Sequence, residues 1–167
     1  NLTTFNGNTQ LINGTAATNF YNLTVGPVTS VTLSHNVTIS NDLILTQGTL
    51  ICGSLAAFVG KDLTNNASYT DSQYGIILNG TFVQQEISGN GSFGRLELNN
   101  SSGATLKNSI TLQKDLVLTR GILDINRYML TLGQNSNIGG TGFGTSKMIT
   151  TDGVFSNVGI TKVFGTG

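Results

Sequence analysis

Carboxylate side chains are the groups in this sequence that could carry out general acid–base chemistry. Among the eight acids of the 167-residue chain, Asp42 and Asp115 occupy matching positions when the sequence is offset against itself by about 73 residues. Catalysis by a carboxylate pair needs both groups over one substrate. Asp115 and Asp124 could approach one another across a coil, but the first copy has Ile51 where Asp124 stands. Asp in a corner just before a strand readily bonds its own backbone. We therefore expect corner roles for these acids and no catalytic residue.

Metal binding and nucleophilic catalysis would depend on His35 and Cys52. They are the single histidine and the single cysteine, and the second copy replaces them with Asn108 and Ile125. One cysteine excludes an internal disulfide, and one histidine provides too few ligands for zinc. We expect His35 to be a solvated turn residue and Cys52 a small core residue. The glycine-rich run 139–144 lacks the lysine and the helix of a phosphate-binding loop. The sequence therefore predicts no metal and no cofactor.

Hydroxyl and aromatic side chains are the candidates for surface binding. Threonines at the centre of apolar–Thr–apolar triplets predict an outward file that could bind ordered water or polysaccharide: Thr32, Thr38, Thr105 and Thr111. The alternative is that Thr is simply a common polar strand residue. The tyrosines could stack on sugars but share no spacing: Tyr21, Tyr69, Tyr74 and Tyr128.

Asn-x-Ser/Thr sequons recur along the chain and mark acceptor positions for N-glycosylation. The candidate sites are Asn22, Asn36, Asn66 and Asn79, and further sequons begin at Asn1, Asn13, Asn90, Asn99 and Asn100. Some of these sequons follow simply from turns that lead into strands containing Thr. Glycosylation also requires a source organism that modifies asparagine.

Short strands must position all these residues. Triplets that alternate apolar, middle, apolar begin six residues apart at 31–33, 37–39 and 43–45, and again at 104–106, 110–112 and 116–118. This period of two is typical of strands with one buried face. The intervening turn residues are too few for a crossover helix. We predict an all-β fold, a right-handed parallel β-helix (β-solenoid), with a tandem β-sandwich as the alternative.

An internal repeat of about 73 residues organises the chain. Leu23 matches Leu96, and Leu33 matches Leu106. Such self-similarity indicates a repeat architecture. We expect a single β-solenoid unit over 1–167, with repeat one at about 4–60, repeat two at about 81–133 and an irregular strand-rich tail at 134–167. In the tail, 146–153 predicts a strand running into a turn, and 159–164 a further strand.

Two further features bear on the surroundings of the solenoid. Ile44 and Val117 replace the central Thr of the third triplet in each copy, which indicates a covered face or simply an exposed β-branched residue. The tail carries no polar cap and Asn1 opens directly into a repeat-like stretch, so we expect a mature or excised part of a longer protein.

Composition narrows the class of partner. Charged residues make up 10% of the chain and the formal net charge is zero, so solubility must come from Thr, Asn, Ser and Gly. Nucleic acid and anionic membranes both attract clustered Lys and Arg, which this sequence lacks. No apolar run is long enough for a membrane span. We therefore expect no nucleic-acid partner and no membrane insertion.

The order of motifs resembles the repeats of large Bacteroidota cell-surface, adhesin-like proteins exported by type IX secretion. The resemblance lies in residues 20–25, 31–33, 36–39 and 43–50, and in the closing stretch from 146–149 through 161–164. It implies a secreted or cell-surface location and a passive role as spacer, stalk or adhesive surface. It carries over no catalytic residue, and the sorting domain of that family is absent from this chain.

We therefore predict a structural or adhesive repeat module, a spacer, stalk or filament subunit rather than an enzyme, whose partners are neighbouring repeats or copies of itself. The alternative is a carbohydrate-binding or cell-adhesion module that contacts surface glycans. A polysaccharide lyase or hydrolase is the third reading, because such chemistry also occurs on β-helices.

Overall fold

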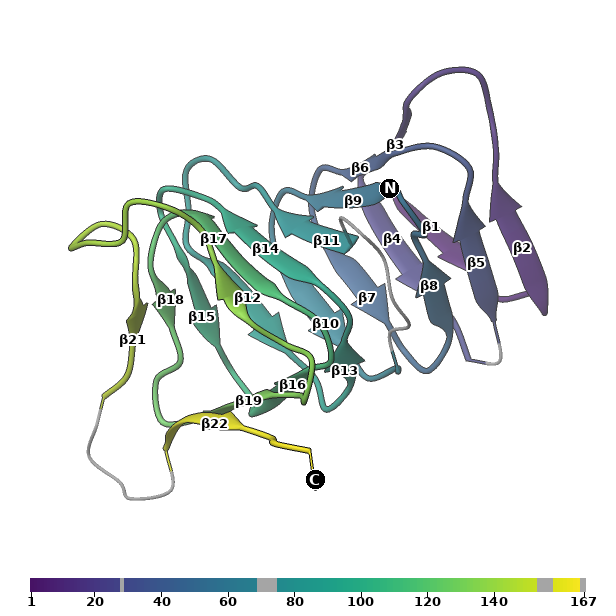
Figure 1. The fold of residues 1–167 in the computed structure, drawn as a ribbon. Helices are drawn as coiled ribbons and strands as arrows, with labels where there is room; N and C mark the ends of the chain where they lie inside the picture. The colour runs from purple at the N-terminus through teal and green to yellow at the C-terminus, as the bar shows by residue number, and fades with distance from the viewer. Residues whose placement is uncertain (28, 69–74, 153–157, 166–167) are drawn as a thin grey trace.

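The computed structural model describes residues 1–27, 29–68, 75–152 and 158–165, and within these ranges the chain forms strands and turns but no helix. The strands stack as a β-solenoid of about seven turns (Figure 1), each of about 20 residues. Neighbouring strands pair in parallel, as in Leu23 beside Leu43. The predicted solenoid is confirmed, and the alternative of a β-sandwich is wrong because successive strands do not pair with one another.

Three faces enclose the core, and a typical turn contributes one strand to each face. In the turn that begins at Leu63, the described residues contain no strand of face 2, and Ser68 forms a single bridge to Ser92. Face 1 is an eight-stranded sheet: β1 (Leu2–Phe5), β4 (Asn22–Val25), β7 (Leu43–Leu45), β10 (Leu63–Asn65), β12 (Gln85–Ser88), β15 (Ala104–Leu106), β18 (Leu123–Asp124) and β21 (Ile149–Thr150). Face 3 is a seven-stranded sheet: β3 (Thr18–Phe20), β6 (Val37–Ile39), β9 (Ala56–Val59), β11 (Gly75–Leu78), β14 (Leu96–Asn99), β17 (Leu116–Arg120) and β20 (Ile138–Gly139).

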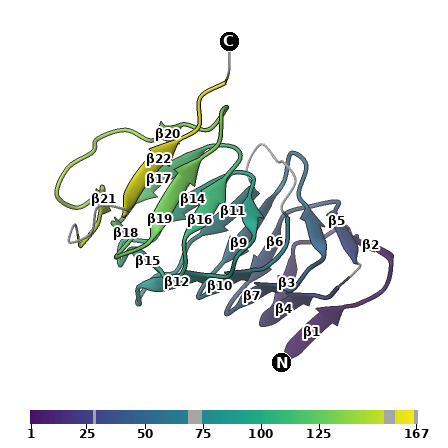
Figure 2. The same cartoon turned by 90° about the horizontal axis from the view of Figure 1, so that it is seen from below.

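Face 2 lies between them in chain order and consists of two shorter sheets. The first contains β2 (Thr9–Ile12), β5 (Ser30–Leu33) and β8 (Thr49–Ile51), and the second contains β13 (Ser92–Phe93), β16 (Ile110–Leu112), β19 (Met129–Leu132) and β22 (Gly159–Lys162). Figure 2 shows β22 and β19 side by side at one end of the stack and β2 beside β5 at the other.

The core is built from side chains that point inward at every second position of a strand. On face 1 one column of such residues is in register and fully buried: Leu23, Leu43, Leu63, Ile87 and Leu106. Burying one aliphatic side chain of this size stabilises a fold by about 1.5–3 kcal/mol. The six predicted triplets all form strands, because their alternation sends two of every three residues into this core.

The repeat of about 73 residues does not coincide with the turns. Leu23 lies on face 1 in β4, whereas its match Leu96 lies on face 3 in β14. Leu33 and Leu106 are likewise on different faces, in β5 and β15. An offset of 73 residues spans between three and four turns of about 20 residues, so matching residues share their inward direction but not their face.

The tail from residue 134 onward continues the same architecture. Its strands β20, β21 and β22 pair with β17, β18 and β19. The predicted strand and turn at 146–153 correspond to β21, with Gly153 outside the described residues, and the predicted strand at 159–164 corresponds to β22.

Candidate functional site

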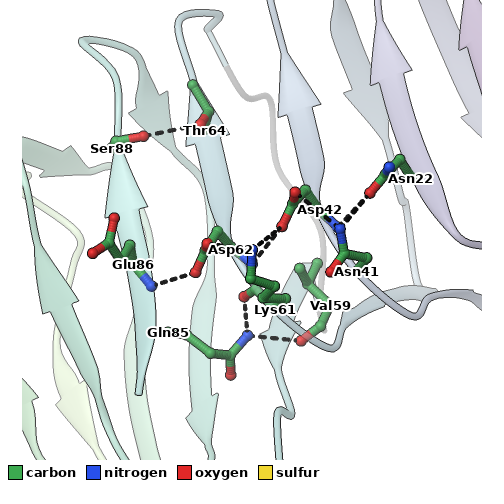
Figure 3. Close-up of polar contacts among 10 residues, drawn as sticks. All are labelled: Asn22, Asn41, Asp42, Val59, Lys61, Asp62, Thr64, Gln85, Glu86 and Ser88. Carbon is green, nitrogen blue, oxygen red and sulfur yellow. Dashed lines mark hydrogen bonds and ion pairs between the residues drawn. The ribbon is translucent and has the colours of Figure 1, made fainter. Parts of the chain in front are cut away.

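A ladder of acidic and amide side chains runs along face 1, where the chain enters the sheet (Figure 3). We call Asn22, Asp42, Asp62 and Glu86 the acid ladder. Asn22 Oδ1 accepts the backbone N–H of Asp42 at 3.1 Å, and Asp42 Oδ1 accepts that of Asp62 at 3.2 Å. Asp62 Oδ1 in turn accepts the backbone N–H of Glu86 at 2.9 Å. The ladder therefore joins four successive turns through side chains, in addition to the strand pairing.

Two lysines offset part of the negative charge of the three carboxylates in this ladder. Lys61 Nζ lies 3.6 Å from Asp42 Oδ1 and 3.3 Å from Asp62 Oδ2, and Lys107 Nζ lies 2.9 Å from Glu86 Oε1. The hydrogen bond to Asp62 and the charges of Asp62 and Asp42 raise the pKa of Lys61. The hydrogen bond to Glu86 and its charge raise the pKa of Lys107 in the same way. Each carboxylate of the ladder thus faces a neighbouring ammonium group.

Buried side-chain amides form hydrogen bonds with backbone groups where the loop 79–84 leaves the stack. Gln85 is fully buried, and its Nε2 donates to the carbonyls of Val59, at 2.9 Å, and Lys61. Its Oε1 accepts from the N–H of Gly80 at 2.9 Å and from Asn100 Nδ2 at 3.1 Å. Buried carbonyl and N–H groups need such partners because water cannot reach them. Gln85 therefore holds the loop and the adjoining turns together.

The four candidate threonines do not form one file. Thr32 lies on face 2 in the first short sheet, Thr38 on face 3, Thr105 on face 1 and Thr111 on face 2 in the second short sheet. Thr105 is buried, and its hydroxyl accepts a hydrogen bond from Asn126 Nδ2 at 2.9 Å. The expectation of a single outward file was wrong because the six-residue spacing of the triplets and the repeat offset both move a residue from one face to another.

The carboxylates considered for catalysis lie at different places in the fold and accept hydrogen bonds from backbone N–H groups. Asp115 Oδ1 accepts the N–H of Asn137 at 2.9 Å, one turn away. Asp124 Oδ1 accepts the N–H of Asn126 at 3.0 Å. Asp42 and Asp124 belong to the corner and strand of face 1, whereas Asp115 precedes a strand of face 3. The predicted corner position of Asp42 and Asp115 is thus confirmed, but each carboxylate accepts a backbone N–H of the following turn instead of bonding its own backbone.

His35 and Cys52 have structural surroundings. The half-buried His35 has its Nε2 2.7 Å from Thr18 Oγ1, across one turn. Cys52 is 1% exposed and packs in the core, which confirms the prediction of a small core residue. Of the tyrosines, Tyr21 is 56% exposed and Tyr128 packs against the core, while Tyr69 and Tyr74 lie outside the described residues.

The candidate glycosylation asparagines lie at corners. The half-buried Asn22 belongs to the acid ladder, the exposed Asn36 accepts the N–H of Ala56 at 2.9 Å, and the exposed Asn66 accepts that of Asn90 at 3.2 Å. Asn79 is half-buried in the loop after β11. Their glycosylation stays a prediction.

The two apolar residues at triplet centres, Ile44 on face 1 and Val117 on face 3, are half-buried and do not share a face.

Sequence reasoning missed the buried amides. Gln85, Asn65 and Asn100 are all fully buried. The alternation of β12 contains a usable indication for Gln85, since it lies two residues before the inward Ile87. No comparable alternation marks Asn100, which lies in a turn of Asn, Ser and Gly.

The described ranges contain no group of three or more His, Cys, Asp or Glu side chains arranged to hold a metal ion. In the same ranges no helix has the length and apolarity needed to cross a membrane. Comparison with protein-family models, curated proteins and solved structures found no match to this chain.

Proposed function

We propose that this chain is a structural repeat module, a spacer or stalk segment of an extracellular or cell-surface protein. The acid ladder is the observation that supports the proposal most directly. The side-chain oxygens of Asn22, Asp42 and Asp62 each accept a backbone N–H of the following turn and so join one turn to the next. The location follows from the resemblance to surface-protein repeats.

A stack of this kind suits a spacer because contacts in the core and contacts at the surface both join its turns. Parallel strand pairing and an apolar core join successive turns, and the corner side chains add hydrogen bonds along the same direction. Adjacent strands are about 4.8 Å apart. Seven such steps from β1 to β21 give a separation of about 34 Å.

The other functional hypotheses, an enzyme, an adhesion module and a filament subunit, have less support. A lyase or hydrolase would need carboxylates directed at a substrate, whereas Asp62 and Asp115 accept backbone N–H groups and Glu97 pairs with Arg95 at 2.8 Å. Adhesion is the second candidate, favoured by Phe82, whose side chain is 92% exposed. Filament formation from copies of the chain is tested by sedimentation at rising concentration.

The spacer proposal is tested by pulsed electron-spin distance measurement. Nitroxide labels on Thr4→Cys in β1 and Thr150→Cys in β21, with Cys52→Ala as background, lie at opposite ends of face 1. In native buffer we expect one narrow distribution centred at about 34 Å plus the length of the two label side chains. In urea we expect a broad distribution. A broad distribution in native buffer, or the release of new sugar ends from a polysaccharide panel by the unlabelled chain, would contradict the proposal.

A further inference from the structure

In the last four turns, the corner where face 3 meets face 1 consists of two long loops and two short turns. The connections there are residues 79–84, 100–103, 121–122 and 140–148. The loop 140–148 projects from the end of the stack in Figure 1. Between this loop and the short turns is a pocket of about 300 Å³, which we call the corner pocket. Its lining includes Ser101, Arg120, Gly121, Ser146 and Lys147.

The corner pocket is positively charged. Arg120 and Lys147 both line it, and its lining contains no acidic residue. Within the described ranges neither cation forms an ion pair with a carboxylate. Thr119, which also lines the pocket, donates its hydroxyl to Glu97 at 2.7 Å, and Glu97 pairs with Arg95 at 2.8 Å. The pocket thus presents two cations without a partner carboxylate of their own.

The wall and the floor of the pocket are fixed. Lys147 and Gly144 form a reciprocal pair of backbone hydrogen bonds of 3.0 and 3.1 Å, which closes the loop on itself. Lys147 Nζ donates to the carbonyl of Thr141 and lies 5.9 Å from the centre of the Phe143 ring. On the floor, Gly121 has a φ of +86°, and a side chain there would overlap the carbonyl oxygen of Asn100. Lys147 is therefore held in place before any ligand arrives, which favours binding.

Hydroxyl groups line the corner pocket, and exposed aromatic side chains lie on the two long loops of the same corner. Ser101 and Ser146 are exposed and add hydroxyls to the lining. Phe143 is 53% exposed on the loop wall, and Phe82 is 92% exposed on the other long loop of the same corner. Guanidinium groups bind carboxylate and sulfate oxygens through paired N–H groups. Aromatic faces and hydroxyls are suited to the apolar and polar sides of a sugar ring.

We propose that the corner pocket binds an acidic saccharide, with the carboxylate of a uronic acid or a sulfate ester between Arg120 and Lys147. A volume of about 300 Å³ is at the lower end for ligand pockets and suits one sugar residue. A nucleic acid is disfavoured because the chain has zero net charge, and polyanion binding depends on many phosphate contacts. Binding of an acidic saccharide at this corner does not depend on the spacer function.

The test is isothermal titration of the whole chain with a uronic-acid trisaccharide and a sulfated disaccharide, at low and physiological salt. The other probes are the neutral disaccharide, inorganic sulfate and a single-stranded DNA 12-mer. The variants are Arg120→Gln, Lys147→Gln and Arg120→Lys. Arg127→Gln is the matched control, because Arg127 is exposed between β18 and β19, at a different corner of the solenoid. Circular dichroism verifies that each variant is folded.

We expect saturable binding of at least one acidic saccharide, at least tenfold weaker in Arg120→Gln and in Lys147→Gln, close to wild type in Arg127→Gln and partly retained in Arg120→Lys. The proposal is overturned if no acidic saccharide binds, or if Arg127→Gln weakens binding as much as Arg120→Gln does. It is also overturned if the neutral sugar, sulfate alone or the DNA binds as tightly. The spin-label distances report on the spacer function independently of all these outcomes.

Discussion

Replacing Gln85 with leucine removes the hydrogen bonds of one buried amide while keeping a side chain of similar size. Gln85 is fully buried, and its two polar atoms serve four groups: the carbonyls of Val59 and Lys61, the N–H of Gly80 and the side chain of Asn100. Leucine offers none of these atoms a partner. The substitution therefore leaves polar groups inside the fold without hydrogen bonds.

The size of the effect follows from counting those groups. A buried polar group that loses its partner destabilises a fold by about 1–3 kcal/mol. Asn100 keeps its bonds to the carbonyls of Val83 and Gly103, and the Val59 carbonyl keeps the backbone N–H of Asn79 at 3.0 Å. We therefore count the two groups that depend on Gln85, the Lys61 carbonyl and the Gly80 N–H. The free energy of unfolding should fall by about 2–6 kcal/mol. For a chain of this length the lower figure corresponds to a decrease in Tm of at least about 4 °C.

Thermal and urea unfolding followed by circular dichroism measures this difference. Gln84→Leu is the matched control, because Gln84 is the exposed neighbour in sequence and should change stability by no more than about 0.5 kcal/mol. Native-state hydrogen exchange would show whether the loss is confined to the turns beside the loop. A loss below about 1 kcal/mol for Gln85→Leu, or one equal to that of Gln84→Leu, would refute the reasoning.

Three further predictions concern a corner, an ion pair and the core. Gly121→Ala should lower the free energy of unfolding by more than about 2 kcal/mol, because the φ of Gly121 is +86° and the new carbon overlaps backbone atoms. Gly53 also has a positive φ but faces open space, so Gly53→Ala should lower the free energy of unfolding by about 1 kcal/mol. Equal losses of the two variants in denaturant titrations would contradict this expectation. The pKa of Lys61 is raised in the folded state, so its pairing with Asp62 stabilises the fold below the ordinary pKa of 10.5 and is lost as the pH rises through the folded value. Stability measured from pH 9 to 12 should show this decline in wild type and less of it in Lys61→Met, and identical profiles would count against the ion pair. Cys52 is 1% exposed, so its reaction with a thiol reagent should proceed only as fast as the fold opens, and immediate labelling in native buffer would be incompatible with its place in the core.

The strands could be predicted from sequence because burial leaves a mark at every second residue. Val31 and Leu33 flank Thr32 in β5, and both apolar residues are buried while the threonine is half-buried. The same alternation identified the strands of both repeat copies. Face identity left no such mark, since an inward leucine looks alike on all three faces. The offset of about 73 residues therefore aligned Thr32 with Thr105 although they lie on different faces.

The candidate sites were less predictable because they depend on contacts between turns. The corner role of Asp42 followed from its position before a strand, but its acceptance of the Asp62 N–H requires the register of the stack. The corner pocket combines Arg120 at the end of β17 with Lys147 from a later loop. Their separation in sequence gives no indication that they line one pocket until the loop 140–148 is placed.

The direction of the ladder bonds has a mechanical consequence. Strand pairing and the acid ladder both join a turn to the next one along the axis of the stack, and each turn touches mainly its neighbours. Tension between the two ends would therefore detach one turn at a time, as a zipper opens. A released turn of about 20 residues extends to roughly 65–70 Å, against the about 4.8 Å it occupied in the stack. Such a chain would lengthen in discrete steps under load, absorbing work at each step, while the remaining turns keep their shape.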